Sequence, residues 1–426
     1  MRNKQVQVVI VGIGGYGATH VKEMLHDIRE QDAVLAGVVD VKPELSRFYG
    51  ELAAAGIPMY DSLESFYANR PGGADLVVIS TPIQYHCPQT CLALQHGSHV
   101  LVEKPVSATV QEARRMMEAE REAAGPFVAV GYNWSFSSQI QQLKRDIQSG
   151  LFGRPQRLRT LVLWRRTQDY FQKGWKGRVK SPQGDWILDS VAHNATSHYL
   201  HNMFYLLGDD TEASALPFRV QAELYRANPI ENFDTCAVRA EVEGGVELLF
   251  LASHAVTGVE GPDFTFEFER AVISYAFGQD NEEIKAVFQD GTEKRYPKAG
   301  GAYFLGTGEQ HSAVEESPKE QSKLLTCIQA VRTGSAGILC GLKAAYPQVL
   351  CMNGMLESSA VADFPESLIR WAEPERVVWV EGLKEALRQC YEQGRLPSEL
   401  GKDWAVPGRW VELATYDSFE GGCLQP

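Results

Sequence analysis

A lysine held between a carboxylate and a proline is the residue of this sequence best suited to chemistry. The tripeptide Glu103-Lys104-Pro105 closes an apolar run at residues 100–102, which predicts that Lys104 lies at the end of a buried strand. Partial desolvation lowers the pKa of a lysine ammonium and lets it bind a reacting oxygen or take part in proton transfer. Such a lysine beside a nucleotide site indicates redox chemistry on a nicotinamide.

A glycine-rich turn upstream supplies the nucleotide site. Residues 6–11 are typical of a buried strand and residues 18–29 of a helix, and the turn lies between them. Glycines in this context let backbone N–H groups approach a pyrophosphate, and the start of the helix adds a positive dipole. The pattern therefore predicts a dinucleotide-binding turn, made of Gly12-Ile13-Gly14-Gly15-Tyr16-Gly17.

Asp40 ends the next predicted strand, about 20 residues after the glycines, where a carboxylate accepts hydrogen bonds from the adenosine ribose. A carboxylate at this position repels a 2′-phosphate, so the sequence favours NAD. Lys42 follows closely and leaves NADP open. The alternative is an ordinary surface aspartate, and loss of NAD affinity on replacing Asp40 by Ala would decide between the two.

These residues need a parallel sheet to position them. Strand and helix patterns alternate up to residue 131, which predicts βαβ units and a doubly wound Rossmann sheet. Strand-like runs then follow one another at residues 219–225, 235–242, 246–254, 264–268 and 271–276. We therefore expect an α/β chain with an NAD(P)-binding domain over 1–131. A substrate-binding and oligomerisation α+β domain with a mostly antiparallel open sheet would cover 132–426.

Composition narrows the function classes. The net charge of −13 argues against nucleic acid or an anionic membrane surface as a partner. Eight cysteines in 426 residues are too sparse for a disulfide scaffold, and no apolar run approaches a membrane span. The sequence predicts a cytoplasmic protein without a metal, although the spacings Cys87/Cys91 and His198/His201 leave a metal reading open.

Three further segments, residues 80–86, 93–100 and 103–105, resemble the Gfo/Idh/MocA family, named for glucose–fructose oxidoreductase and inositol dehydrogenase. With the glycine turn, the similarity covers most of the region before residue 131. It implies hydride transfer between NAD(P) and a hydroxyl of a sugar, glycoside or cyclitol. The cofactor contacts that it implies beyond the turn and Asp40 are Thr81, Pro82, His86, Glu103 and Lys104.

The second domain resembles the family more loosely, through residues 184–193. This segment fits the family's aspartate-x-x-x-histidine pattern, with Asp189 and His193 four residues apart, and on a helical turn the two would share a side. The resemblance implies that Lys104 binds the reacting oxygen, that His193 accepts or donates the proton and that Asp189 orients substrate or imidazole. The alternative for His193 is a structural histidine. Val191 and Thr196 depart from the family pattern and indicate a divergent branch.

A basic and aromatic stretch, residues 164–186, is predicted to line the mouth of the active site. Aromatic faces pack on sugar C–H surfaces, and arginines hold hydroxyls or a carboxylate. A solvated loop or an oligomer contact is the alternative. Candidate substrate contacts are Trp175 and Arg178 in this stretch, His254 at a strand end, and Asn133 and Trp134 after the last Rossmann strand.

Two other functions fit the same residues. One is redox-neutral cleavage of a glycoside through a transient keto-sugar with retained NAD. The other is a dinucleotide-binding sensor without catalysis, against which the set Lys104, Asp189 and His193 argues. The family resemblance also predicts a homo-oligomer through the C-terminal sheet. The substrate, the reacting carbon and the number of subunits stay open.

Overall fold

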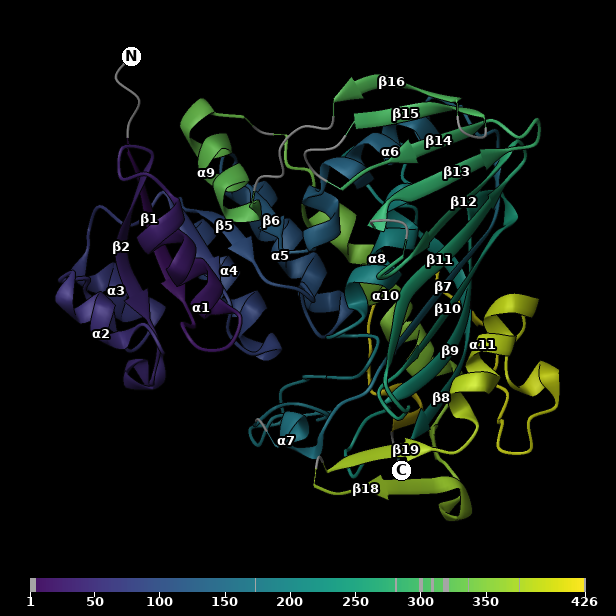
Figure 1. The fold of residues 1–426 in the computed structure, drawn as a ribbon. Coiled ribbons are helices and arrows are strands. Elements are labelled where there is room, and N and C mark those ends of the chain that lie inside the picture. Colours follow the sequence, from purple (N-terminus) through teal and green to yellow (C-terminus); the bar gives the residue numbers. More distant parts are fainter. Residues whose placement is uncertain are drawn as a thin grey trace. The chain divides into compact units, whose positions relative to one another are not determined.

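A computed structural model describes residues 5–172, 174–279, 282–298, 302–307, 310–316, 322–335, 337–374 and 376–424. The chain divides into two compact units (Figure 1). Unit 1 consists of Met1–Phe136 and Gln321–Tyr346, and unit 2 of Ser137–Glu320 and Pro347–Pro426. The two units are described separately.

A parallel sheet, with six strands among the described residues, forms the centre of unit 1. The near-continuous apolar runs of β1, β4 and β5 are buried on both faces, as parallel strands under helices require. The strand order β3-β2-β1-β4-β5-β6 is that of a Rossmann fold. The bounds are β1 Val6–Val11, β2 Ala33–Val39, β3 Met59–Tyr60, β4 Leu76–Ile79, β5 His99–Val102 and β6 Val128–Val130.

The helices of unit 1 include one from much later in the chain. Helix α9 (Lys323–Thr333) packs on this sheet, and its Leu324, Cys327 and Ile328 belong to the same buried cluster as β1. Unit 1 is thus discontinuous in sequence, and the predicted boundary at residue 131 does not describe this return. The earlier helices are α1 Gly17–Lys22, α2 Tyr49–Ala54, α3 Leu63–Asn69, α4 His86–Gln95 and α5 Val110–Ala123.

Unit 2 is built on a mostly antiparallel sheet, with twelve strands counted over the described residues. The order is β16-β15-β14-β13-β12-β11-β7-β10-β9-β8-β17, with β20 paired to β8; β7/β10 and β8/β17 are parallel. The bounds are β7 Pro155–Trp164, β8 Pro217–Arg226, β9 Thr235–Val242, β10 Val246–Ser253, β11 Val259–Phe268, β12 Ala271–Ala276, β13 Ile284–Phe288, β14 Glu293–Tyr296, β15 Ala302–Thr307, β16 Gln310–Glu316, β17 Val361–Asp363 and β20 Val411–Glu412. The predicted α/β class with two unlike sheets is confirmed.

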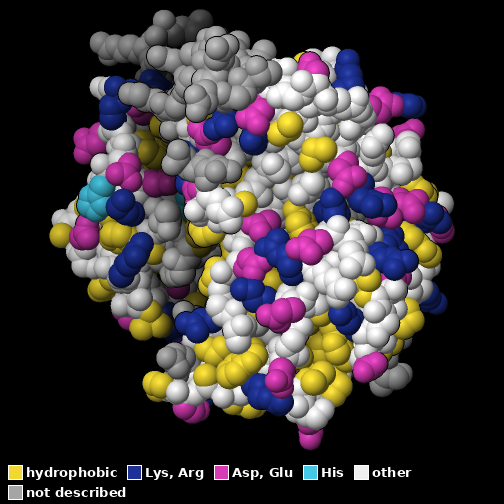
Figure 2. Space-filling view, turned by 45° about the vertical axis from the view of Figure 1, so that its right-hand side comes forward, with side chains coloured by type: hydrophobic (Ala, Val, Ile, Leu, Met, Phe, Trp, Pro, Cys, Tyr) yellow, Lys and Arg dark blue, Asp and Glu magenta, His cyan; other side chains and the backbone are white. Residues whose placement is uncertain are grey.

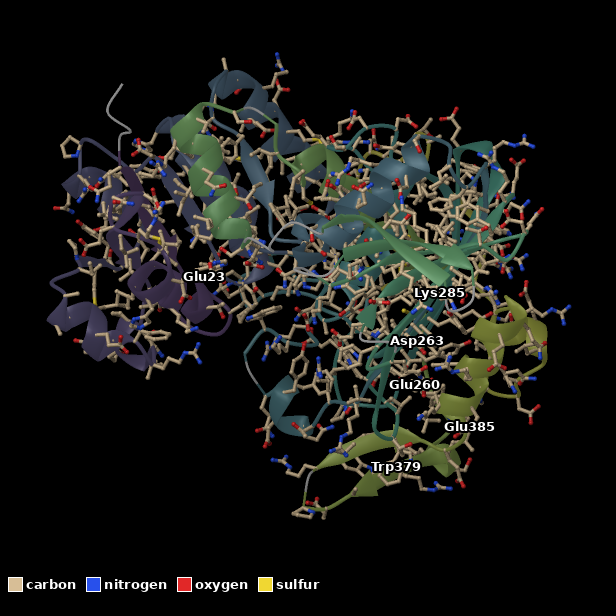
Figure 3. The ribbon with its side chains drawn as sticks, turned by 45° about the horizontal axis from the view of Figure 1, so that its top comes forward. Glu23, Glu260, Asp263, Lys285, Trp379 and Glu385 are labelled. Carbon is tan, nitrogen blue, oxygen red and sulfur yellow. The ribbon has the colours of Figure 1, made fainter. Side chains whose placement is uncertain are left out.

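Helices and a C-terminal arm complete unit 2. Helix α11 packs on β7 and β10, and its Arg388 pairs with Glu260 and Asp263 of β11, which Figure 3 labels together with Glu385 of α11. A small hairpin of β18 (Ile369–Ala372) and β19 (Val377–Val380) precedes α11. The helices are α6 Ser138–Gln148, α7 Gln168–Phe171, α8 Ser197–Leu206, α10 Leu342–Ser358, which begins in unit 1, and α11 Leu383–Gln393.

Surface charge is mixed in sign. Figure 2 shows basic and acidic side chains interspersed over the face that it presents. Within the described part of the chain, every helix is too short or too polar to cross a membrane.

Candidate active site

The glycine turn after β1 has two kinds of glycine. A Cβ on Gly12 would lie 2.7 Å from the carbonyl oxygen of Ser80, and a Cβ on Gly17 would lie 1.9 Å from that of Gly12. Both therefore keep the turn tight against β4. A Cβ on Gly14 or Gly15 would meet no atom within 4 Å. The turn thus leaves backbone open to an approaching group, as a pyrophosphate cradle requires.

Asp40 follows β2 and fixes this turn. Its Oδ2 accepts a hydrogen bond from the backbone N–H of Ile13 at 3.0 Å, and its Oδ1 accepts one from that of Lys42 at 2.9 Å. The carboxylate therefore lies beside the glycine turn, where the sequence analysis places it. Contact with a ribose stays a prediction.

His86 joins two loops at the same end of the sheet. Its Nδ1 lies 2.8 Å from the carbonyl oxygen of Pro105, and its Nε2 lies 2.9 Å from that of Thr81. Burial lowers the pKa of His86 despite these two carbonyl contacts. The ring ties the end of β4 to the segment that carries Lys104. The predicted cofactor contacts of Thr81, Pro82 and His86 stay predictions.

Glu103 is the centre of a buried charge network. Its Oε1 lies 2.6 Å from Nζ of Lys323 and 2.8 Å from Nε2 of His20. Lys323 also donates to the carbonyl oxygen of Gly131 at 3.1 Å and to Oδ1 of Asn133 at 2.8 Å. We call His20, Glu103, Lys323 and Asn133 the Glu103 cluster. It joins α1, the end of β5, the chain after β6 and the start of α9.

The charge states of this cluster follow from its contacts. Burial on its own would raise the pKa of Glu103, but the charge of Lys323 and the hydrogen bond from His20 hold that pKa well below its usual range. Burial would lower the pKa of His20, but the hydrogen bond to Glu103 and the carboxylate of Glu23, 3.7 Å from Nδ1, outweigh it and raise that pKa. Glu103 is therefore a carboxylate. Lys104 is half-buried and comes directly after this immobilised residue.

The sequence analysis missed His20 and Lys323. A Cβ on Gly131 would lie 2.8 Å from Oε2 of Glu103 and 2.9 Å from Nζ of Lys323. Gly131, which follows the last Rossmann strand, is thus the sequence signal that other side chains pack closely at this point. The partner lysine, nearly 200 residues later, leaves no local pattern. Asn133, a candidate substrate contact, uses its side-chain oxygen in the cluster, and Trp134 is half-buried.

Asp189 and His193 lie in unit 2, in a segment that is not helical. The backbone N–H groups of Ile187 and Leu188 donate to the carbonyl oxygen of Val179, and that of Asp189 donates to Arg178. Leu188 has a φ of 52°, a left-handed conformation that no α-helix contains. The predicted helical turn is therefore wrong. His193 is buried in the turns at residues 191–195 that precede α8.

The carboxylate of Asp189 holds a loop together. It is buried and accepts hydrogen bonds from the backbone N–H of Gly177 and, at 2.8 Å, from Nδ2 of Asn194. Gly177 has a φ of 71°, and a Cβ there would lie 2.8 Å from Ile230. Only glycine fits this position without displacement. Asp189 thus anchors the predicted mouth segment to the turn that carries His193.

Tyr170 is the centre of a second group in unit 2. Its ring lies under two cations, with Lys176 Nζ 4.3 Å and Arg166 Cζ 5.1 Å from the ring centroid. The ring of His254 packs edge-on at 5.9 Å, and its Nδ1 lies 2.7 Å from the carbonyl oxygen of Trp164. Burial, then the charges of Arg166 and Lys176, lower the pKa of His254 to about 3. The imidazole is neutral and forms part of this packing.

The remaining residues of the stretch at 164–186 differ in their burial and contacts. Trp175 is half-buried, with Nζ of Lys176 at 4.6 Å from its ring centroid, whereas Arg178 is exposed. Lys173 lies outside the described residues. Trp186 packs edge-on against the buried Phe419 at 5.1 Å. The C-terminal segment that carries Phe419 therefore supports the stretch.

The two histidines of α8 differ in burial, since His198 is half-buried and His201 lies in the core. His201 is buried and stacks on Tyr205 at 5.4 Å, and burial lowers its pKa well below the usual value. His193 precedes the helix that carries His198 and His201. Among the described side chains, no group of three His, Cys, Asp or Glu is arranged to hold a metal ion.

The predicted residues thus fall into two sets. The glycine turn, Asp40 and the residues from Thr81 to Lys104 belong to unit 1, as do Asn133 and Trp134. The residues of unit 2 are Trp175, Arg178, Asp189, His193 and His254. Within unit 1, His86 contacts Thr81 and Pro105 and so joins two of the segments that carry candidates. Within unit 2, Asp189 does the same through Gly177 and Asn194.

Comparisons with known proteins match this division. Residues 6–132 match the family model GFO_IDH_MocA, described as an oxidoreductase family with an NAD-binding Rossmann fold. Inositol 2-dehydrogenase 4 of Saccharopolyspora erythraea is 33% identical over 159 residues, which are 36% of this chain and 44% of that protein. The chain thus spans less than half the length of this curated relative.

Solved structures extend the similarity of fold. The WlbA dehydrogenase of Bordetella pertussis, in complex with NADH and UDP-GlcNAcA, has a TM-score of 0.62 at 21% identity, over 83% of this chain and 95% of that one. An inositol dehydrogenase homologue of Azotobacter vinelandii, with NADH and myo-inositol, has a TM-score of 0.63 at 18% identity, over 83% and 96%. At these identities the likeness shows the fold alone.

The family match covers the strands and turns from which the resemblance was inferred, and it confirms both the resemblance and the NAD-binding class of unit 1. Residues 6–132 of the chain are thus similar to the NAD-binding Rossmann region of the Gfo/Idh/MocA family of oxidoreductases.

Proposed function

We propose that the protein is an NAD(P)-dependent dehydrogenase that transfers a hydride between the nicotinamide and a hydroxyl of a sugar, glycoside or cyclitol. The observation that carries this proposal is the placement of Lys104. It directly follows a carboxylate immobilised by Lys323 and His20, at the end of β5, which β4 separates from β1 and its glycine turn. A protein that only bound a dinucleotide would need no proton-transfer group there.

The glycine turn fits a dinucleotide. Gly12 and Gly17 exclude a side chain, whereas Gly14 and Gly15 leave their Cβ directions open. We assign the pyrophosphate to this turn and the adenosine ribose to Asp40, which favours NAD. The bound nicotinamide would supply the hydride acceptor.

The chain's own residues would bind the substrate and move its proton. Lys104 holds the reacting oxygen. As the hydride leaves the carbinol carbon, the hydroxyl proton passes to His193, and the substrate becomes a ketone. Asp189 acts through its contacts with Asn194 and the Gly177 N–H, which fix the turn that carries His193. It is therefore a positioning residue.

We also propose that copies of the protein associate through the C-terminal sheet, part of which α11 covers.

The test is the near-ultraviolet absorbance of reduced nicotinamide, with enzyme near stoichiometric with NAD and a panel of cyclitols, sugars and glycosides. We expect Lys104→Met to lower turnover by about 10²–10⁴-fold while NAD stays bound, because general acid–base groups contribute that much. Lys22→Met, at an exposed lysine of α1, is the matched control.

Full activity of Lys104→Met would refute the scheme. A rise in absorbance that stops at one equivalent would instead support the redox-neutral alternative with retained cofactor. NAD binding without any rise would support the sensor.

A further inference from the structure

Tyr16 is an aromatic side chain within the glycine turn, and almost half of it is exposed. Its relative exposure is 46%, whereas Ile13 of the same turn is fully buried. It comes directly before Gly17, whose close approach to Gly12 keeps the backbone tight at this point. A large exposed ring is therefore held in the turn to which we assign the pyrophosphate, and its contacts define the direction in which it points.

Three contacts anchor the Tyr16 ring on the Glu103 cluster. Nζ of Lys323 lies over the ring, 4.5 Å from its centroid. The ring of His20 packs at a steep angle, with the two centroids 5.5 Å apart. The phenol oxygen is 3.5 Å from Oδ1 of Asn133, at the limit of a hydrogen bond. The ring is thus oriented by the protein before a ligand arrives.

The two faces of the ring differ in exposure. Lys323 is only 6% exposed, so its ammonium closes the face that it covers to solvent. The opposite face is therefore the one that a ligand can reach. The ammonium itself is held by Glu103 at 2.6 Å and by the carbonyl oxygen of Gly131 at 3.1 Å. The ring thus rests on a cation that the fold keeps in place.

The strand order shows on which side of the turn the ring lies. Asp40 follows β2, on one side of β1, whereas Glu103 follows β5 and Asn133 follows β6, both beyond β4 on the other side. A dinucleotide crosses the carboxyl edge of such a sheet, with its two nucleotide halves on opposite sides of the switch point. With the adenosine at Asp40, the nicotinamide half lies on the side to which Tyr16 extends. Lys104 follows β5 and belongs to that side as well.

We propose that the exposed face of Tyr16 binds the nicotinamide half of the cofactor, and that Lys323 positions the ring from its buried side. This assignment rests on the proposed function, which places only the pyrophosphate and the adenosine ribose in the turn and at Asp40. A flat ring that is anchored in advance packs on another flat ring with little further loss of freedom. Tyr16 is thus a cofactor contact, and Lys323, which acts through the ring, is a positioning residue.

Calorimetric titration of the full chain with NADH and with ADP-ribose tests the proposal. ADP-ribose has the adenosine, the pyrophosphate and the second ribose of NADH but lacks the nicotinamide. The ratio of the two affinities therefore measures what the nicotinamide ring contributes. NADH is the probe because its nicotinamide carries no charge that would repel Lys323. We expect the parent protein to bind NADH more tightly than ADP-ribose, and equal affinities would overturn the proposal.

Variants assign this preference to the ring. Tyr16→Ala should weaken NADH binding about tenfold, because one aromatic contact is lost, and leave the affinity for ADP-ribose unchanged. Tyr16→Phe keeps the ring and should bind both ligands as the parent does, and Tyr16→Leu replaces the alanine variant if that folds poorly. Tyr49→Ala, at a comparably exposed tyrosine of α2, is the matched control and should leave the ratio unchanged. An equal loss for both ligands in Tyr16→Ala would mean that the ring only supports the turn, which would overturn the proposal.

A double-mutant cycle tests the role of Lys323. Lys323→Met should weaken NADH binding more than ADP-ribose binding, and Lys323→Arg should recover part of this difference because it keeps a cation at the ring. In the Tyr16→Ala background, Lys323→Met should not change the ratio further. A loss that is equal for both ligands, or a change of the ratio that persists without the ring, would overturn the assignment of Lys323 as a positioning residue.

The absorbance of reduced nicotinamide, recorded with NAD and the substrate panel, separates this proposal from the proposed function. A Tyr16-dependent preference for NADH without any hydride transfer would support the nicotinamide contact and contradict the dehydrogenase. Hydride transfer together with an affinity ratio that Tyr16→Ala does not change would support the dehydrogenase and overturn the role of Tyr16.

Discussion

Replacing Lys323 by methionine tests the Glu103 cluster most directly. The methionine keeps the volume of the lysine stem but removes the ammonium that lies 2.6 Å from Glu103 and also donates to Gly131 and Asn133. Both side chains of the pair are less than a tenth exposed. The variant therefore leaves a buried carboxylate with His20 as its remaining partner in the cluster.

The magnitude follows from this burial. Removing one partner of a buried ion pair costs about 3–5 kcal/mol, and the contact with His20 places the expected loss near 3 kcal/mol. The melting transition of unit 1 should then fall by roughly 6–12 °C. Backbone amides at residues 103–106 and 131–136 should exchange hydrogen about 100-fold faster where exchange requires unfolding of the unit. Lys22→Met should change stability by less than about 0.5 kcal/mol, because its ion pair with Asp27 is exposed.

The pH dependence of this loss has a definite sign. The pKa of His20 is raised by Glu103 and Glu23, so His20 adds stability below its unfolded pKa of about 6.5 and loses that stability as the pH rises through its folded pKa. In Lys323→Met, protonated His20 is the counter-charge that remains. The variant should therefore be less destabilised at pH 6 than at pH 8.5.

Differential scanning calorimetry at the two pH values, with hydrogen exchange at pH 7.5, measures these quantities. A loss below about 1 kcal/mol at pH 8.5 would show that Glu103 is hydrated or neutral, and the reasoning from burial would fail. A loss that grows on acidification to pH 6 would also contradict it. Glu103→Gln in the same background should recover part of the lost stability, because it removes the unpaired charge.

Two further variants test how the mouth segment of unit 2 is supported. Gly177→Ala should destabilise the protein by about 2 kcal/mol or more, because it combines a left-handed backbone with a Cβ 2.8 Å from Ile230. Gly174→Ala is the control, because Gly174 has a φ of 65° and a Cβ there would meet no atom within 4 Å. The difference in stability between the two variants, measured by calorimetry, therefore isolates the cost of the clash with Ile230. Equal losses of stability would argue against this clash. Phe419→Ala should cost about 3–5 kcal/mol and speed tryptic cleavage in the stretch, because it removes a buried ring from Trp186. Unchanged cleavage would mean that the C-terminal segment gives the stretch no support.

Local patterns predicted the elements whose apolar periodicity is unbroken. The strands at residues 6–11, 235–242 and 271–276 begin and end where the sequence places them. The hairpin strands β13 and β14 were missed, since they are short and carry alternating charges such as Lys285 and Glu293, which pair across the strands. The return of α9 to unit 1 depends on contacts between distant residues, and no local pattern encodes it.

The site was predictable to the extent that it follows backbone geometry. The glycine turn and the neighbouring Asp40 lie together, as the strand–turn–helix pattern requires. The predicted helical turn from Asp189 to His193 is wrong because backbone hydrogen bonds to Arg178 and Val179 hold residues 187–189 in a non-helical conformation. Spacing alone does not reveal this contact across the loop. Buried charge partners such as Lys323 are found only when the fold is known.

The discontinuity of unit 1 has a consequence for folding during synthesis. Leu324, Cys327 and Ile328 of α9 complete the apolar cluster beneath β1, and Lys323 neutralises Glu103. The ribosome makes the first segment of unit 1 and must then translate from Ser137 to Glu320 before this helix exists. At 5–20 residues per second that delay lasts roughly 10–40 s. During this time the nascent Rossmann sheet has an uncovered apolar surface and an unneutralised carboxylate, so chaperone binding to the nascent chain should be strongest in this interval.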